Sequence, residues 1–163
     1  MFGRHEKELV TGWLTETSDQ NAEILVSTDH VSVVSIVGHG GKGITTLAQL
    51  ICKVDGVINH FEKVLWACVS TIFDAKTIIG TILESYTLAK PTASSLEALL
   101  KILRKELKSV KFLLVLDDVW EDSENEQWQK LFAPLREGKS GSKKFADNSD
   151  AFCGRFCYQF NRR

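Results

Sequence analysis

The stretch that decides the fold runs from Val33 to Leu50 and reads VVSIVGHGGKGITTLAQL. An apolar run is followed by a glycine-rich turn, and the turn leads into a helical pattern that opens on two threonines. This order resembles the phosphate-binding motif G-x-x-x-x-G-K-[ST]. The matching residues are Gly38, His39, Gly40, Gly41, Lys42, Gly43, Ile44 and Thr45, so isoleucine stands where the motif has lysine.

A polyphosphate needs backbone N–H groups that point inward from a tight, concave turn. Gly38, Gly40, Gly41 and Gly43 suit that turn because glycine tolerates positive φ and close approach. His39 contributes only its backbone in this interpretation. The following helix adds unpaired N–H groups and the positive end of its dipole, and the Thr45 hydroxyl is the candidate Mg²⁺ ligand.

The Ile44 side chain cannot supply the charge that the motif's lysine gives to the β- and γ-phosphates. Lys42 lies two positions earlier and is the only nearby candidate for partial replacement. Losing one charge-assisted contact costs roughly 1.5–3 kcal/mol, which corresponds to about tenfold to a hundredfold in affinity. Hydrolysis should suffer more, because charge develops on the phosphates in the transition state. The alternative is a glycine-rich turn that binds no ligand.

A second informative stretch, residues 111–120, reads KFLLVLDDVW. A continuous apolar run predicts a strand that is buried on both faces. Asp117 and Asp118 follow at its carboxyl end, where sheets with alternating helices bind ligands. Asp117 is the candidate Mg²⁺ partner, directly or through water, and Asp118 is the candidate for orienting a water. Taken alone, the pair would be a solvated turn; a glycine-rich loop upstream favours the functional interpretation.

These segments resemble the nucleotide-binding (NB-ARC) domain of plant disease-resistance proteins with leucine-rich repeats. The resemblance covers residues 2–143 and includes FGRHEKEL, HFEKVLWACVS and WQKLFAPLREGKSGSK in the family's order. Trp120 after the acidic pair is typical of members that carry an N-terminal coiled coil. The resemblance implies a P-loop NTPase-like parallel sheet flanked by helices, incomplete at its C-terminal end.

The family's domain is a weak ATPase that acts as a switch, holding ADP at rest and ATP when active. The resemblance implies that Gly38, Gly40, Gly41, Gly43, Thr45 and Thr46 contact phosphates. It implies Mg²⁺ at Thr45 and Asp117, an acidic catalytic role for Asp118, and adenine beside Phe2, Gly3 and Arg4. Coiled-coil and leucine-rich-repeat domains, the family's intramolecular partners, are absent from this sequence.

The sequence departs from the family again after Lys143. The family's next strand, which ends in Thr-Thr-Arg, is missing, and residues 144–163 show no helical or strand period. Residues 144–150, KFADNSD, are compatible with codons that, read one base later, encode Asn-Leu-Leu-Thr-Thr-Arg-Met. The hypothesis is a frameshift or a gene-model error at this point; the alternative is an ordinary divergent tail. We expect the loss of this strand to leave a short sheet with an exposed edge and marginal stability.

The 163 residues are enough for one domain with a sizeable core. Three segments are expected: an N-terminal helix and linker over residues 1–30, the partial nucleotide-binding domain over 31–143, and an irregular tail over 144–163.

A net charge of −1 argues against nucleic acid as a partner. No signal segment or transmembrane run is visible, so a cytoplasmic protein is expected. Cys52 and Cys68 are expected in the core.

Strands are predicted at 31–37, 63–69 and 112–116. Helices are predicted at 4–14, 45–53, 75–85, 126–135, and from Ser94 or Ser95 to Lys108. Alternating strands and helices predict a parallel sheet.

Three functions compete: an ADP- or ATP-binding switch fragment in plant defence, a degenerate fragment that binds no nucleotide (a pseudogene product or an interaction module), and an independent P-loop kinase or ATPase. The third is disfavoured because no lid or second substrate site is visible.

Overall fold

The protein is represented by a computed structural model that describes residues 4–15, 31–37, 43–69, 74–119 and 126–148. Strands and helices alternate along most of this length. In chain order the elements are α1 (Arg4–Thr15), β1 (Val31–Val37), α2 (Ile44–Ile51), α3 (Asp55–His60), β2 (Lys63–Cys68), α4 (Ala75–Thr87), α5 (Leu96–Leu107), β3 (Phe112–Asp117), α6 (Glu126–Phe132), the 3-10 turn η1 (Pro134–Glu137) and β4 (Ser142–Asn148).

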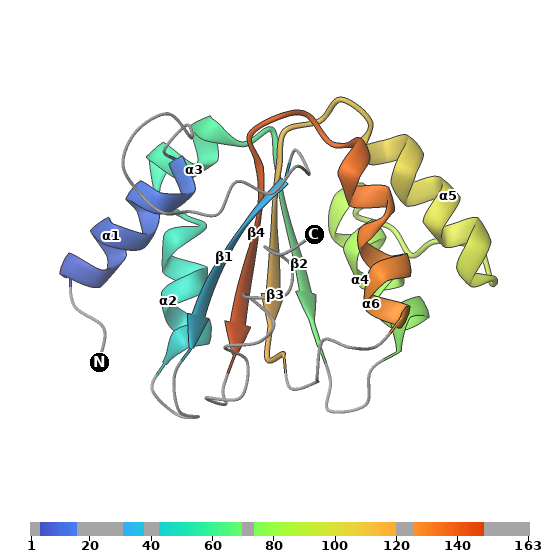
Figure 1. The fold of residues 1–163 in the computed structure, drawn as a ribbon, viewed down its shortest axis with the longest axis horizontal. Coiled ribbons are helices and arrows are strands. Elements are labelled where there is room, and N and C mark those ends of the chain that lie inside the picture. Colours follow the sequence, from blue (N-terminus) through green and yellow to red (C-terminus); the bar gives the residue numbers. More distant parts are fainter. Residues whose placement is uncertain (1–3, 16–30, 38–42, 70–73, 120–125, 149–163) are drawn as a thin grey trace.

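The four strands form one parallel sheet in the order β1-β4-β3-β2 (Figure 1). Val31 pairs with Ser142 and Val37 with Asn148, so β1 and β4 are matched along their whole lengths. Because all strands run the same way, their carboxyl ends meet at one edge of the sheet. The carboxyl ends of β1 and β3 therefore lie at the same edge, which brings the two informative sequence stretches together.

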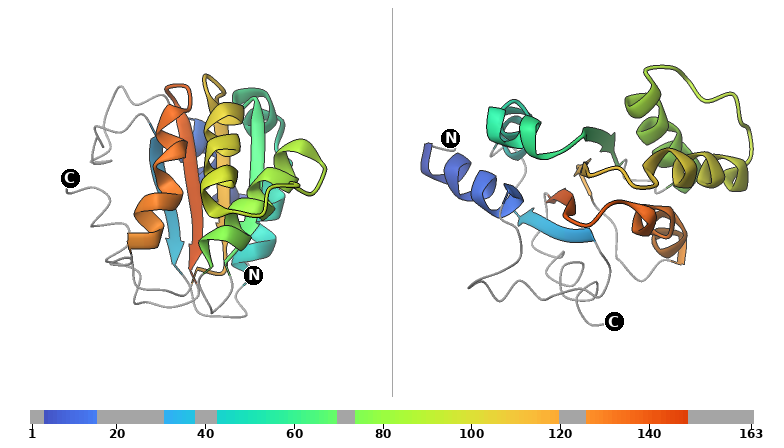
Figure 2. Two further views of the ribbon diagram at one scale, coloured as in Figure 1. Left: turned by 90° about the vertical axis from the view of Figure 1, so that its right-hand side faces the viewer. Right: turned by 90° about the horizontal axis from the view of Figure 1, so that it is seen from above.

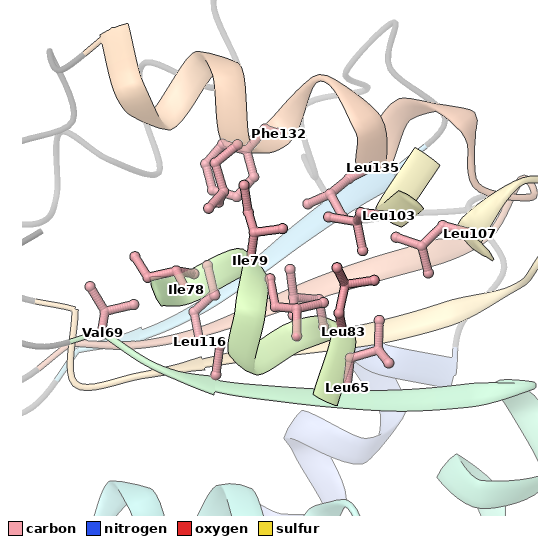
Figure 3. Close-up of a cluster of buried hydrophobic side chains, with 14 of the residues drawn as sticks. Leu65, Val69, Ile78, Ile79, Leu83, Leu103, Leu107, Leu116, Phe132 and Leu135 are labelled. Carbon is pink, nitrogen blue, oxygen red and sulfur yellow. The ribbon is translucent and has the colours of Figure 1, made fainter. Parts of the chain in front are cut away.

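Helices cover both faces of the sheet, giving a three-layer arrangement in which α1, α2 and α3 lie on one side and α4, α5 and α6 on the other (Figures 1 and 2). The larger core lies on the second side, where apolar side chains from α4, α5, α6 and η1 meet those of β2 and β3 (Figure 3). β3 is buried at every position, as the continuous apolar run predicts. Burial on both faces explains why this strand shows no alternation.

The smaller core joins α1, α2 and α3 to the opposite face of β3. Val10 and Leu14 of α1 pack there with Leu113 and Val115. Lys143 of β4 is 4% exposed, and its ammonium group donates a hydrogen bond to the backbone carbonyl of Trp13. That carbonyl lies in the last turn of α1, where the helix dipole favours a cation. The N-terminal helix is thus held to the sheet by apolar packing and by one buried charge.

The expectation of an irregular segment from residue 144 onward is wrong for residues 144–148, and the expected loss of the strand is wrong with it. β4 runs across the predicted boundary at Lys143 and lies inside the sheet, paired with β1 on one side and β3 on the other. The physical reason is that ladder hydrogen bonds use backbone groups, which every residue except proline supplies. The segment contains no proline or glycine. Residues 149–163 lie outside the described part of the chain.

Side-chain caps account for the starts of two helices, α4 and α5. The Ser95 hydroxyl accepts a hydrogen bond from the Ala98 N–H (3.2 Å) and caps α5, as predicted. Asp74 caps α4 by accepting from the N–H groups of Lys76 (3.3 Å) and Thr77 (3.1 Å). The short helix α3 was not predicted, because its N-cap, Val54, makes no side-chain hydrogen bond. Within the described residues, no helix has the length and apolar character needed to cross a membrane.

Candidate functional site

The start of α2 is formed by Gly43 and the first residues of the helix. Gly43 is the N-cap and has φ of 81°, a left-handed conformation that suits glycine. Its carbonyl accepts the first helical hydrogen bond, from the Leu47 N–H at 2.9 Å. No side chain caps this end, and no acidic residue lies in the first turn. The N–H groups at the start of the helix have no intrahelical acceptors and carry positive partial charge.

The two predicted Mg²⁺ ligands lie beside this helix start and contact each other. The Thr45 hydroxyl donates a hydrogen bond of 2.8 Å to the Asp117 carboxylate, although 72 positions separate the two residues. Thr45 is exposed, whereas Asp117 is 7% exposed. The carboxylate is therefore fixed at the carboxyl end of β3 with one oxygen aimed at the helix start. This contact joins the stretch 33–50, which contains Thr45, to the stretch 111–120, which contains Asp117.

Asp118, the predicted catalytic acid, follows directly and has φ of 58°. Aspartate tolerates this left-handed region better than most residues, but the conformation is uncommon outside glycine. The turn ends β3 and leaves Asp118 half-buried while Val119 returns to the core. Immediately after Asp117, the candidate Mg²⁺ ligand, the chain is therefore half-buried at Asp118 and fully buried again at Val119.

Cys68 is a residue of this edge that sequence reasoning misplaced. It was expected in the core but is exposed. It pairs in register with Asp117, so its side chain lies on the same face of the sheet as that carboxylate. Partial burial, then the charges of Asp117 and Asp118, raise the pKa of the Cys68 thiol. The thiol is therefore protonated at neutral pH. The missed signal was its position at the last residue of β2, where burial ends.

The other predicted site residues are described only in part. Phe2, Gly3 and the loop residues Gly38, His39, Gly40, Gly41 and Lys42 lie outside the described residues. Ile44 is the first residue of α2, Thr46 is exposed in the same first turn, and Arg4 is exposed at the start of α1. The structure thus brings together Gly43, Thr45 and Asp117. The adenine-side prediction for residues 2–4 stays a prediction.

With this geometry in place, comparison with known proteins decides the family. The model of the NB-ARC domain matches residues 14–146. The chain belongs to the NB-ARC domain family. This match extends past Lys143 into β4, in keeping with the strand seen there. The predicted α/β fold, a parallel sheet flanked by helices, is confirmed.

Relatives in plants support the same assignment. The chain is 38% identical over 130 residues to the disease resistance protein RGA2 of Solanum bulbocastanum, covering 76% of this chain and 13% of that protein. It is 27% identical over 150 residues to the disease resistance RPP13-like protein 4 of Arabidopsis thaliana, covering 92% of this chain and 16% of that protein. The chain therefore spans only a small fraction of the relatives it matches.

Among solved structures, the chain is similar to one described as the structure of Drosophila ORC bound to DNA. The TM-score is 0.59, with 13% sequence identity, over 94% of this chain and 40% of that one. At this identity the likeness concerns the fold alone. It supports a parallel sheet flanked by helices.

Proposed function

We propose that this NB-ARC chain binds an adenine nucleotide, ADP in preference to ATP, together with Mg²⁺, as the switch domain of a plant disease-resistance protein acting in defence. The observation that carries the proposal is the hydrogen bond between Thr45 and Asp117 beside the uncapped start of α2. In this proposal the helix start would bind phosphate oxygens and the neighbouring Thr45 and Asp117 oxygens would bind the metal, as a Mg²⁺–phosphate complex requires.

The donor set fits Mg²⁺. Thr45 offers a neutral hydroxyl and Asp117 a carboxylate, both hard oxygen ligands, and their oxygens lie 2.8 Å apart. Neighbouring oxygens in an octahedral Mg²⁺ shell are about 2.9 Å apart, given Mg–O distances of about 2.05 Å. The pair is thus already spaced like two adjacent ligands. The metal would neutralise charge on the phosphates, while the protein holds the two oxygens in position.

Each further residue has a limited role in this proposal. Gly43 and the first N–H groups of α2 would bind phosphate oxygens, and Thr46 lies in the same turn. Asp118 would orient a water, but hydrolysis is expected to be weak. Ile44 in place of lysine removes the charge that stabilises the transferred phosphoryl group. The diphosphate is favoured over the triphosphate because fewer negative charges have to be balanced without that lysine.

A second candidate is a degenerate fragment that keeps the fold and binds no nucleotide. Ile44 at the motif's lysine position is the specific observation that favours it. A second observation is that β4 carries none of the Thr-Thr-Arg residues of the family strand. The frameshift hypothesis for residues 144–163 belongs with this candidate. Sequencing of the transcript across the Lys143 codon tests it, and it fails if no Leu-Leu-Thr-Thr-Arg frame is present.

The setting of the domain is also part of the proposal. The relatives are far longer than this chain, so coiled-coil and leucine-rich-repeat segments are proposed as its intramolecular partners in a full-length receptor. A cytoplasmic location is proposed with them. No nucleic-acid partner is proposed, since the chain carries a net charge of −1.

Titration calorimetry with ADP tests the nucleotide site. The wild type should bind ADP more tightly with Mg²⁺ than with EDTA, and Thr45→Val should lose most of that Mg²⁺ dependence. Thr81→Val is the matched control, because Thr81 is an exposed helical threonine whose hydroxyl bonds only to the Thr77 carbonyl (3.0 Å) in α4. The proposal fails if a folded wild-type chain binds no ADP at millimolar concentration. It also fails if the affinity for ADP is the same with Mg²⁺ as with EDTA.

A further inference from the structure

Lys143 is a buried cation that lies away from the proposed nucleotide site. It is 4% exposed and is the second residue of β4, so it lies near the amino edge of the sheet, opposite the edge that carries Asp117. Burial of a charged side chain is unfavourable unless the charge is paired or hydrogen-bonded. The contacts of this ammonium group therefore show what the buried charge holds in place.

The ammonium group of Lys143 joins the end of α1 to the sheet. It donates a hydrogen bond to the Trp13 carbonyl, in the last turn of the helix, where carbonyls lack intrahelical donors. That turn contains no basic residue of its own, so β4 supplies the cation that the helix dipole favours there. Lys143 also pairs in register with Leu113, which packs in the smaller core with Val10 and Leu14 of α1.

α1 in turn packs beside the helix that begins at the proposed phosphate site. α1 and α2 are in contact and lie on the same side of the sheet (Figure 1). The buried residues of α2 are Leu47, Ala48 and Ile51, and they share the smaller core with Val10 and Leu14. α2 has eight residues, and so short a helix depends on tertiary packing for its stability. The position of α2 therefore depends on α1.

We propose that Lys143 is a positioning residue for the nucleotide site: it holds α1 on the sheet, and α1 holds α2, whose first turn would bind the phosphates. This inference rests on the proposed function and adds to it a residue from the opposite edge of the sheet. Without the ammonium group, the last turn of α1 loses its attachment to β4, and the core over α2 loosens. Thr45 is then held less firmly beside Asp117.

The same arrangement makes the docking of α1 sensitive to a ligand at the start of α2. Coupling between two sites is reciprocal, so whatever α1 contributes to ligand affinity, the ligand returns to the docking of α1. Inorganic pyrophosphate with Mg²⁺ is the suitable probe, because it offers two phosphates without an adenine ring. A response of α1 to pyrophosphate therefore has to pass through the phosphate-binding helix.

Binding by a Lys143→Met variant tests the first half of this coupling. The substitution keeps most of the apolar side chain and removes the ammonium group. In titration calorimetry, the affinities for ADP and for pyrophosphate, both with Mg²⁺, should each fall by about twofold to thirtyfold, the range for residues that contact neither ligand. Gly138→Ala is the control for general destabilisation, because its new methyl group meets Phe112 in the larger core, on the other side of the sheet. It should leave both affinities of the folded protein unchanged.

Hydrogen exchange of the same proteins tests the second half. In the wild type, pyrophosphate with Mg²⁺ should slow the exchange of α1 amides more than that of α5 amides, which lie on the opposite side of the sheet. In folded Lys143→Met, this slowing of α1 should be lost, and α2 amides should exchange faster than in the wild type even without ligand.

Three outcomes overturn the inference: Lys143→Met binds both ligands as the wild type does, Gly138→Ala loses as much affinity, or wild-type α1 exchange does not respond to pyrophosphate. If Lys143→Met does not fold, the wild-type exchange measurement decides. If the folded wild type binds neither ligand, the proposed function fails. The ligand-free exchange of α2 amides in Lys143→Met then still decides whether this lysine positions α2.

Discussion

The hydrogen bond between Thr45 and Asp117 should couple the two stretches that define the site, and a double-mutant cycle measures that coupling. Thr45→Val removes the hydroxyl and keeps the branched shape, and Asp117→Leu replaces the carboxylate by an apolar group. Hydrogen bonds to charged groups contribute about 1.5–3 kcal/mol. Thr45 is exposed, so water competes for the contact, whereas Asp117 is 7% exposed. The expected coupling is therefore at or just below the lower limit of that range, about 1–1.5 kcal/mol.

Urea denaturation of the wild type, the two single variants and the double variant, all in EDTA, gives the coupling free energy of unfolding. EDTA keeps Mg²⁺ from replacing the hydrogen bond. The reasoning is refuted if the two changes are additive within about 0.3–0.5 kcal/mol, the usual scatter for independent sites. In that case the 2.8 Å contact would contribute nothing to the energy of the site, and the proposed positioning of Asp117 would lose its support.

Three further predictions concern other parts of the fold. Gly138→Ala should destabilise the protein by about 1–3 kcal/mol in urea denaturation, since the added methyl group overlaps the buried Phe112 ring; the entropic gain of about 0.4–1 kcal/mol is smaller. Gly43→Ala should cost about 1–2 kcal/mol through its φ of 81° alone, because no atom lies within 4 Å of the new Cβ, and ADP affinity should fall with it. Asp74→Ala should cost about 1 kcal/mol at neutral pH and Asp74→Asn almost nothing. The hydrogen bond from the Thr77 hydroxyl lowers the pKa of Asp74, so its contribution is present above the unfolded-state pKa and is lost as pH falls through the folded-state pKa. Thermal melts at pH values below the ordinary aspartate pKa of about 3.9 should therefore show wild type and Asp74→Ala converging.

Much of the fold could be predicted because side-chain patterns specify it locally. The apolar run of β3 and the amphipathic pattern of α4 gave elements that the structure contains at nearly the same positions. The sequence did not predict β4, because this strand is held by backbone hydrogen bonds to its two neighbours, β1 and β3, and its side chains show no strand pattern. The sequence did not predict α3 either, because that helix has only six residues and no side-chain cap.

The site was predictable residue by residue, but its contacts were not. Motif spacing singled out Thr45 and Asp117, and the parallel-sheet rule places both at one edge. The hydrogen bond between them depends on how α2 packs on β3, which no local pattern encodes. The contact of Lys143 with the Trp13 carbonyl is similar. It joins residues far apart in the sequence and arises only once α1 is packed on the sheet.

The most direct test of the central claim is the nucleotide content of the purified chain, released by denaturation and quantified beside an Ile44→Lys version. If the start of α2 and the Thr45–Asp117 pair bind ADP without the motif's lysine, as proposed, both proteins should contain ADP, with higher occupancy in the lysine version. ADP in the lysine version alone would contradict the account and identify the wild type as a degenerate site, and a folded pair with no nucleotide in either would contradict nucleotide binding altogether.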